Sequence, residues 1–62
     1  MNFHIQAMTC GGCARAVTAA IRAIDPAAEV QADPPSHSVE VRSERPEAEV
    51  RAALVAAGFP PS

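Results

Sequence analysis

The two cysteines of the chain, Cys10 and Cys13, are separated by two glycines and lie between an alternating apolar segment and a segment of helical periodicity. If Cys13 begins a helix, Cys10 stands just before the first turn, and residues three apart there lie on one side. The unpaired N–H groups and partial positive charge of a helix N-terminus favour thiolate over thiol. The spacing therefore predicts two sulfur ligands that converge on one point.

Two thiolates favour a soft metal ion. They select ions such as Cu(I), whereas a closed Zn(II) site normally needs four ligands. Gly11 and Gly12 add no side chain, so the backbone can wrap closely around a bound ion. We interpret Met8 as core packing, because an apolar methionine beside a strand more often fills a core than binds a metal. We interpret His4 and His37 as ordinary surface groups and assign neither to the metal.

The spacing of the cysteines also occurs in redox dithiols, half zinc sites and haem attachment sites. Haem attachment is excluded, because Ala14 stands where a histidine would follow the second cysteine. A dithiol redox protein is the competing function. A thioredoxin-like site belongs to a longer fold than 62 residues provide, so the residues favour a binding module over an enzyme.

The segment from Met8 to Cys13 resembles the M-x-C-x-x-C loop of the heavy-metal-associated domains. That family includes copper chaperones, mercury-binding proteins and the N-terminal modules of metal-exporting P-type ATPases. The resemblance covers residues 1–59 and leaves residues 60–62 as a short proline-rich tail. It implies an α+β fold, a ferredoxin-like βαββαβ sandwich with two helices on one face of an antiparallel sheet. It implies Cys10 and Cys13 as metal ligands, with the loop supported by Met8, Thr9, Gly11, Gly12 and Phe59.

The resemblance also implies a cargo and a partner. Thr9 favours Cu(I), because zinc- and cadmium-handling members tend to carry an acidic residue before the first cysteine; Hg(II), Zn(II) and Cd(II) are the alternatives. We expect a Cu(I) metallochaperone that passes its ion by thiolate exchange to a metal-exporting P-type ATPase or its soluble domain. Phe59 looks more like the residue of a transporter's own domain than the lysine or tyrosine of many free chaperones, so a detached transporter module stays open.

Composition bounds the other properties. A chain of 62 residues forms one domain with a thin core. Its formal net charge of −2, with arginine as the basic residue throughout, argues against nucleic acid. Arg15 and Arg22 are most simply a solvated helix face, with a weak docking patch for an acidic partner as the functional alternative. We expect a monomer without metal, and a metal-bridged dimer is the alternative with metal.

The start of the chain shows no basic and apolar segments of a secretory signal, and no apolar run approaches the ~20 residues of a membrane span. We therefore expect a cytoplasmic location, where cysteines stay reduced.

The elements that must position the cysteines follow from periodicity. Phe3, Ile5 and Ala7 alternate with polar residues and predict a strand with these three facing inward. An apolar stripe from Cys13 to Ile24 predicts a helix, which ends where Pro26 follows. Alternation on either side of the proline-rich turn at residues 33–36 predicts a hairpin of two strands.

A second helix should begin near Pro46, which suits a first helical turn. Its predicted core stripe consists of Val50, Ala53, Leu54 and Ala57, with Gly58 as a left-handed C-cap. The fourth strand of the family fold should then follow Phe59. Proline cannot donate to a strand ladder, so the prolines at 60 and 61 predict that this strand is truncated or absent and that the order is βαββα.

Overall fold

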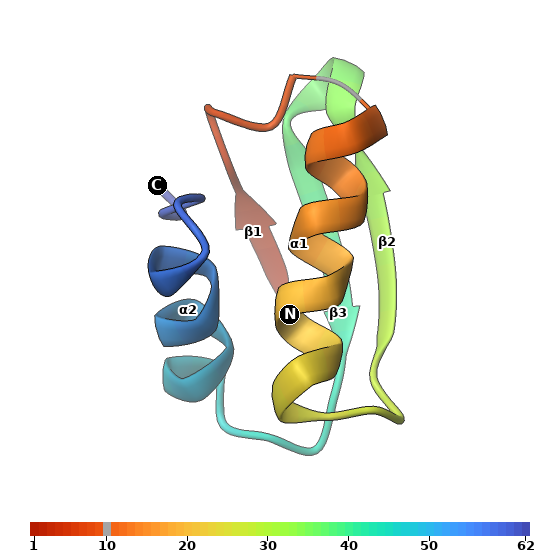
Figure 1. Cartoon of the computed structure of the whole chain (residues 1–62), viewed down its shortest axis with the longest axis vertical. Helices are drawn as coiled ribbons and strands as arrows, with labels where there is room; N and C mark the ends of the chain where they lie inside the picture. Colours follow the sequence, from red (N-terminus) through yellow and green to blue (C-terminus); the bar gives the residue numbers. More distant parts are fainter. Residues whose placement is uncertain (10) are drawn as a thin grey trace.

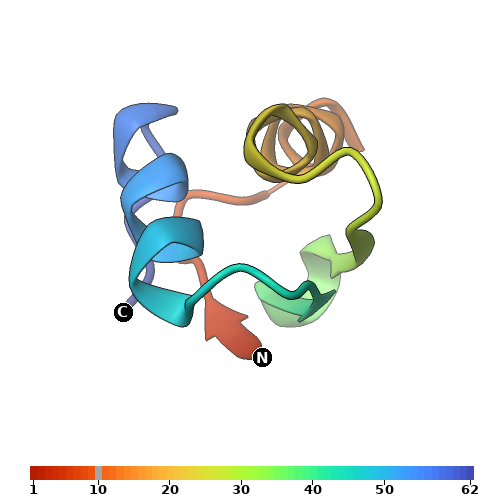
Figure 2. The same ribbon diagram turned by 90° about the horizontal axis from the view of Figure 1, so that it is seen from below.

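The computed structural model, which describes residues 1–9 and 11–62, is a three-stranded antiparallel sheet with two α-helices on one face (Figures 1 and 2). The described elements follow in the order β1 (Asn2–His4), α1 (Gly11–Ile24), β2 (Glu29–Asp33), the short 3-10 helix η1 (Pro34–Ser36), β3 (Ser38–Arg42) and α2 (Glu47–Ala56). The strand order β1-β3-β2 places β3 in the centre. This is the predicted ferredoxin-like architecture without its fourth strand.

The register of the sheet separates an apolar face from a polar one. Val39 of β3 pairs with Phe3 of β1 and with Ala32 of β2, and Val41 pairs with Val30. Val39 and Val41 are buried under the helices, while the alternate residues of β3 are exposed on the opposite face. The alternation of apolar and polar residues in the sequence therefore arises because the helices cover one face of the sheet and solvent covers the other.

The core joins both helices to the sheet. Its α1 contribution is Val17 and Ile21, and its α2 contribution is Val50 and Leu54, as the helical stripes predict. Among residues 1–9 and 11–62, the buried apolar side chains are Phe3, Ile5, Met8, Val17, Ile21, Ala28, Val39, Val41, Val50 and Leu54. Because the set is small, each of its members carries a large share of the stability of the domain.

The chain after α2 lies where a fourth strand would run but forms no strand over residues 59–62. Its contact with β1 is a backbone hydrogen bond in which the Ser62 N–H donates to the His4 carbonyl at 2.7 Å. Pro60 and Pro61 have no N–H to add to such a ladder. The predicted truncation is confirmed.

The C-terminus of α2 ends in a Schellman arrangement. Gly58 has φ 88° and donates its N–H to the Val55 carbonyl at 3.1 Å, while Phe59 donates to the Leu54 carbonyl at 2.9 Å. These two bonds satisfy carbonyls that the helix itself leaves without partners. The predicted left-handed cap at Gly58 is confirmed, and it directs Phe59 back toward the core, where its ring is half-buried.

Three local predictions are wrong. Ala7 is exposed rather than inward, because β1 ends at His4 and a turn follows in which Met8 donates to the Ile5 carbonyl at 3.1 Å. Ala57 is also exposed, because it is the C-cap of α2, where the apolar stripe leaves the core. The first helix begins at Gly11 rather than at Cys13.

Candidate metal centre

The segment before the cysteines is a turn, and the buried side chain of Met8 anchors it to the core. The Ile5 N–H donates to the His37 carbonyl at 2.8 Å, which ties the start of this turn to the entry of β3. Met8 is fully buried within the core. The expected packing of Met8 is confirmed, and its burial fixes the direction in which the chain enters the loop; its support of a bound ion stays a prediction.

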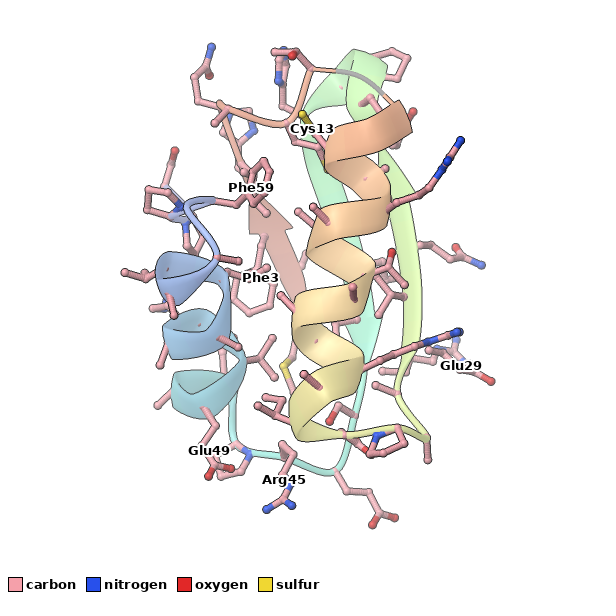
Figure 3. The ribbon with its side chains drawn as sticks, in the orientation of Figure 1. Phe3, Cys13, Glu29, Arg45, Glu49 and Phe59 are labelled. Carbon is pink, nitrogen blue, oxygen red and sulfur yellow. The ribbon has the colours of Figure 1, made fainter. Side chains whose placement is uncertain are left out.

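Cys13 is the third residue of α1 and lies half-buried at the edge of the core. In Figure 3 its sulfur lies at the loop end of the molecule, the end toward which Phe59 also projects. Cys10, the other predicted ligand, lies outside the described residues. The convergence of the two sulfurs on one ion therefore stays a prediction, and the structure supplies the position of one of them.

The electrostatics of this helix end favour an anionic sulfur. The first turn of α1 contains no acidic side chain, and Arg22 stands in its last turn. The partial positive charge of the helix N-terminus is therefore not offset by a carboxylate of the same turn, and it stabilises negative charge near Cys13. This is the environment in which a thiolate binds a soft cation.

The residues around the cysteines leave the site open on its outer side. Thr9, Gly11 and Gly12 are all exposed. A methyl group added at Gly11 would meet no described atom within 4 Å. The open space agrees with a loop that a second protein can approach, and among the described residues no packing contact requires glycine at position 11.

The family resemblance implies that Phe59 supports the metal loop. Its ring is half-buried and packs against the core beside the C-terminus of α2. The structure therefore shows the packing role. A cover for a bound ion stays a prediction, although Figure 3 places the ring toward the loop end.

Arg15 and Arg22 are both exposed on the outer face of α1. They border a shallow surface depression of about 450 Å³, lined by Ala14, Arg15, Thr18, Ala19, Arg22 and Ala32. The side chains that lie between Arg15 and Arg22 on this face are small. The predicted docking patch is thus physically available, and its use stays a prediction.

Two findings limit what else the chain can be. Across residues 1–9 and 11–62, no group of three or more His, Cys, Asp or Glu side chains forms a metal cage. In the same residues, no helix has the length and apolar character needed to cross a membrane. The described side chains therefore offer no closed four-ligand site of the structural zinc type.

Sequence reasoning missed one feature of this end of the molecule. It treated His4 and His37 separately, but their rings lie 5.9 Å apart, centre to centre. The signal that could have found the pair is the antiparallel register of the first and third strands, which brings the end of one beside the start of the other.

Comparison with known proteins agrees with this geometry. The sequence profile described as "Heavy-metal-associated domain" matches residues 2–60. No curated protein sequence matches the chain. Among solved structures, a gold-binding protein is 46% identical with a TM-score of 0.96, and the match covers 98% of this chain and 94% of that one.

Two further structures show the same likeness. The copper chaperone Atx1 from Synechocystis PCC6803 is 32% identical with a TM-score of 0.97, covering 100% of this chain and 98% of that one. Protein Atu1203 from Agrobacterium tumefaciens is 39% identical with a TM-score of 0.91, covering 100% and 97%. The match to each extends over nearly the full length of both chains.

Proposed function

Because the chain belongs to the heavy-metal-associated domain family, we propose that it is a carrier of one Cu(I) ion, held by the thiolates of Cys10 and Cys13. The observation that carries the proposal is the position of Cys13, half-buried in the first turn of α1 and packed against the core that contains Met8. A soft, low-coordinate ion is the cargo that two thiolates suit best.

The carrier function follows from the openness of the loop. Exposed Gly11 and Gly12 leave one side of the ion accessible to an incoming thiolate. A third sulfur can therefore bind before a resident sulfur leaves, so that the ion moves between proteins without being released to water. We propose a metal-exporting P-type ATPase, or its soluble domain, as the recipient, with the exposed arginines of α1 as the docking contacts.

The function is a binding one. Members of this family act as metal-carrier modules, and the copper chaperone Atx1 matches this chain over its full length. A dithiol redox activity of Cys10 and Cys13 is the competing proposal. It predicts rapid exchange with protein disulfides, which a disulfide-exchange assay on the metal-free protein measures directly.

One observation favours a second cargo. The gold-binding protein, at 46% identity, is more similar in sequence to this chain than the copper chaperone from Synechocystis, at 32%. Au(I), Cu(I) and Hg(II) are all soft ions that two thiolates bind, so ligand type alone does not separate them. We propose Cu(I) as the cargo, with Au(I) or Hg(II) carriage as the alternative.

The test is an anaerobic titration of the protein with Cu(I), Au(I), Hg(II), Zn(II) and Cd(II), read by native mass spectrometry and by competition with a chelator of known affinity. We expect one Cu(I) per chain as the tightest physiological complex. Cys10→Ser and Cys13→Ser should each abolish tight binding, because a hydroxyl is a poor ligand for a soft ion. Tight Cu(I) binding that survives Cys10→Ser would place the site elsewhere, and dimers seen only with metal would indicate a bridged form.

A further inference from the structure

His4 and His37 come from separate strands but lie together at the loop end of the sheet. Their ring centres are 5.9 Å apart, with the ring planes tilted by 50°. His4 is the last residue of β1, and His37 links η1 to β3. The 2.8 Å hydrogen bond from the Ile5 N–H to the His37 carbonyl holds the two backbones in register, so the proximity of the rings is built into the sheet.

The backbone of His37 is unusual. It adopts φ 56° and ψ 28°, the one left-handed conformation of a non-glycine residue among those described. The conformation is fixed by a hydrogen bond in which the His37 N–H donates to the Pro34 carbonyl at 3.1 Å. Histidine tolerates this region better than bulky residues do, but the conformation is uncommon and can mark a functional position.

The side chain of His37 contains a buried nitrogen whose hydrogen-bonding capacity is not used by the described residues. Its Nδ1 atom is buried and has no hydrogen-bond partner among the described residues. A buried polar atom without a partner costs about 1–3 kcal/mol. A ligand that reaches this ring would remove that cost, and an imidazole nitrogen is a good ligand for a transition metal.

The surroundings of His4 suit a cation. His4 is exposed, and its Nε2 lies 3.2 Å from Oε1 of Gln6, an exposed side chain that can move aside. Ser38, the register partner of His4, has its Oγ 2.7 Å from Oγ of Ser36. Ser36 in turn donates to Oδ2 of Asp33 at 2.8 Å, so a chain of hydroxyls links the register partner of His4 to a carboxylate.

The spacing of the rings fits a shared ion. Two imidazoles bound to one tetrahedral ion, with metal–nitrogen bonds of about 2.0–2.1 Å, have ring centres about 5–5.5 Å apart. The observed 5.9 Å needs only a small closure and a rotation of each ring. We propose that His4 and His37 form a second metal site, separate from the cysteines, for a borderline divalent ion of the Zn(II) type.

The ligand chemistry separates this site from the cysteine site. Imidazole favours Zn(II) and similar ions, whereas paired thiolates favour Cu(I). No third histidine, cysteine or carboxylate joins the pair to form a cage in the part of the chain that the structure describes. Water therefore completes the coordination, and the site is open and exchangeable rather than structural.

The test uses the full chain with both cysteines replaced by serine, so that thiolates cannot bind the probe. Zn(II) is added while NMR follows the imidazole resonances of His4 and His37. We expect both rings to respond together and to saturate at one Zn(II) per chain. His4→Gln and His37→Asn should each weaken binding about tenfold or more, because even the loss of an outer partner of a metal ligand costs 10–100-fold.

The variants are chosen to fold. His4 is exposed, and asparagine tolerates the left-handed backbone of position 37. Val55→Ala, at a position of α2 that is 55% exposed, is the control and should leave Zn(II) binding unchanged. Independent responses of the two rings, no saturation, or unchanged affinity in either histidine variant would overturn the proposal. Cu(I) affinity of the cysteine-containing protein should not change in His37→Asn; a fall there would make His37 part of the cysteine site instead.

Discussion

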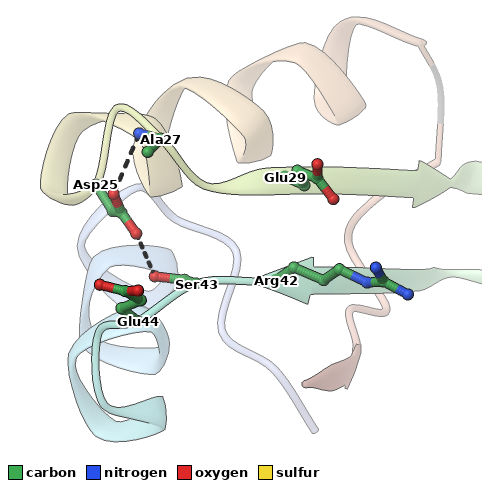
Figure 4. Close-up of a pocket in the computed structure, with 6 residues that line it drawn as sticks. All are labelled: Asp25, Ala27, Glu29, Arg42, Ser43 and Glu44. Atoms are coloured by element: carbon green, nitrogen blue, oxygen red, sulfur yellow. Dashed lines mark hydrogen bonds between the residues drawn. The ribbon is translucent and has the colours of Figure 1, made fainter.

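Ser43 donates a hydrogen bond of 2.6 Å from its Oγ to Oδ2 of Asp25, and this contact joins the end of α1 to the segment between β3 and α2 (Figure 4). The other carboxylate oxygen accepts from the Ala27 N–H at 3.1 Å. The side chain of Asp25, which follows the last residue of α1, therefore also holds the connection between β3 and α2 in place. Both contacts lie at the end of the domain away from the cysteine loop.

The first prediction is an acid-sensitive contribution of Asp25 to stability. The hydrogen bond from Ser43 is the largest cause that holds the pKa of Asp25 below its ordinary value, and the Ala27 N–H adds to it. A carboxyl with a lower pKa in the folded state stabilises the fold above its unfolded pKa. That contribution is lost as the pH falls below about 4, through the folded pKa.

Two variants isolate this contribution. In Ser43→Ala the pKa of Asp25 should rise, and denaturant unfolding between pH 5 and pH 2 should show a smaller loss of stability than in the parent protein. Asp25→Asn removes the titration at this position altogether. An unchanged NMR titration of Asp25 in Ser43→Ala would contradict the assigned cause.

The second prediction concerns two glycines that both have open space around them. Gly58 has φ 88°, whereas Gly11 lies in the first turn of α1, and a methyl group at either position would meet no described atom within 4 Å. Gly58→Ala should reduce the free energy of unfolding by about 1–2 kcal/mol, because only the left-handed backbone is penalised. Gly11→Ala should be neutral or stabilising by up to about 1 kcal/mol.

Urea unfolding of both metal-free variants measures this difference. Equal effects at the two positions would show that the Schellman end of α2 does not depend on glycine. Because Gly11 lies beside the cysteines, Cu(I) affinity is a separate readout of that variant and does not enter the comparison of stability.

How far the sequence determines this structure is visible at particular residues. Val39 and Val41 alternate with polar neighbours, and Val17 and Ile21 are spaced by one helical turn, so their burial follows from period alone. Gly58 and Pro60 have backbone preferences strong enough to end an element without help from packing. These local signals were sufficient for the order of elements and for the missing fourth strand.

The wrong or missing predictions concern residues whose positions are determined by tertiary contacts. Ala7 continues the alternation of β1, but the chain must turn at Ile5 to carry Met8 into the core, and that turn leaves Ala7 exposed. The pairing of His4 with His37 depends on the register of β1 against β3, which no single segment contains. The place of Cys13 in the first turn of a helix could be predicted from the local pattern, but the exact start of that helix, at Gly11, could not.

The third prediction separates packing from ligation at Met8, which is fully buried. Met8→Ala should cost about 2–5 kcal/mol, which is comparable with the total stability of so small a domain. Met8→Leu conserves volume and should cost less than about 1.5 kcal/mol. If Met8 only packs, Met8→Leu keeps the parent Cu(I) affinity.

Chelator competition measures that affinity, and thermal or urea unfolding confirms that the leucine variant is folded. Val55→Ala, at a position that is 55% exposed, is the control and should change stability by no more than about 0.5 kcal/mol. A folded Met8→Leu protein with much weaker Cu(I) binding would make the thioether a third ligand.

The fourth prediction concerns transfer and the role of the α1 surface. Cu(I)-loaded protein is mixed with a metal-free recipient domain that has its own cysteine pair, in the presence of a competing chelator. Direct thiolate exchange predicts transfer faster than the rate at which the chelator traps released ion. Transfer limited to that trapping rate would exclude exchange through a shared complex.

Charge reversal then locates the docking contact. Arg15→Glu should slow transfer to an acidic recipient, because Arg15 is exposed on α1 near the cysteine end, beside the depression that Arg22 also borders. Arg42→Glu is the matched control: it makes the same change of charge on the exposed face of β3, where the Arg42 side chain is 76% exposed. Exposed charges are screened beyond about 8 Å at physiological ionic strength, so added salt should slow the parent protein and have less effect on Arg15→Glu. Equal slowing by Arg15→Glu and Arg42→Glu would mean that net charge, and not the α1 surface, governs the encounter.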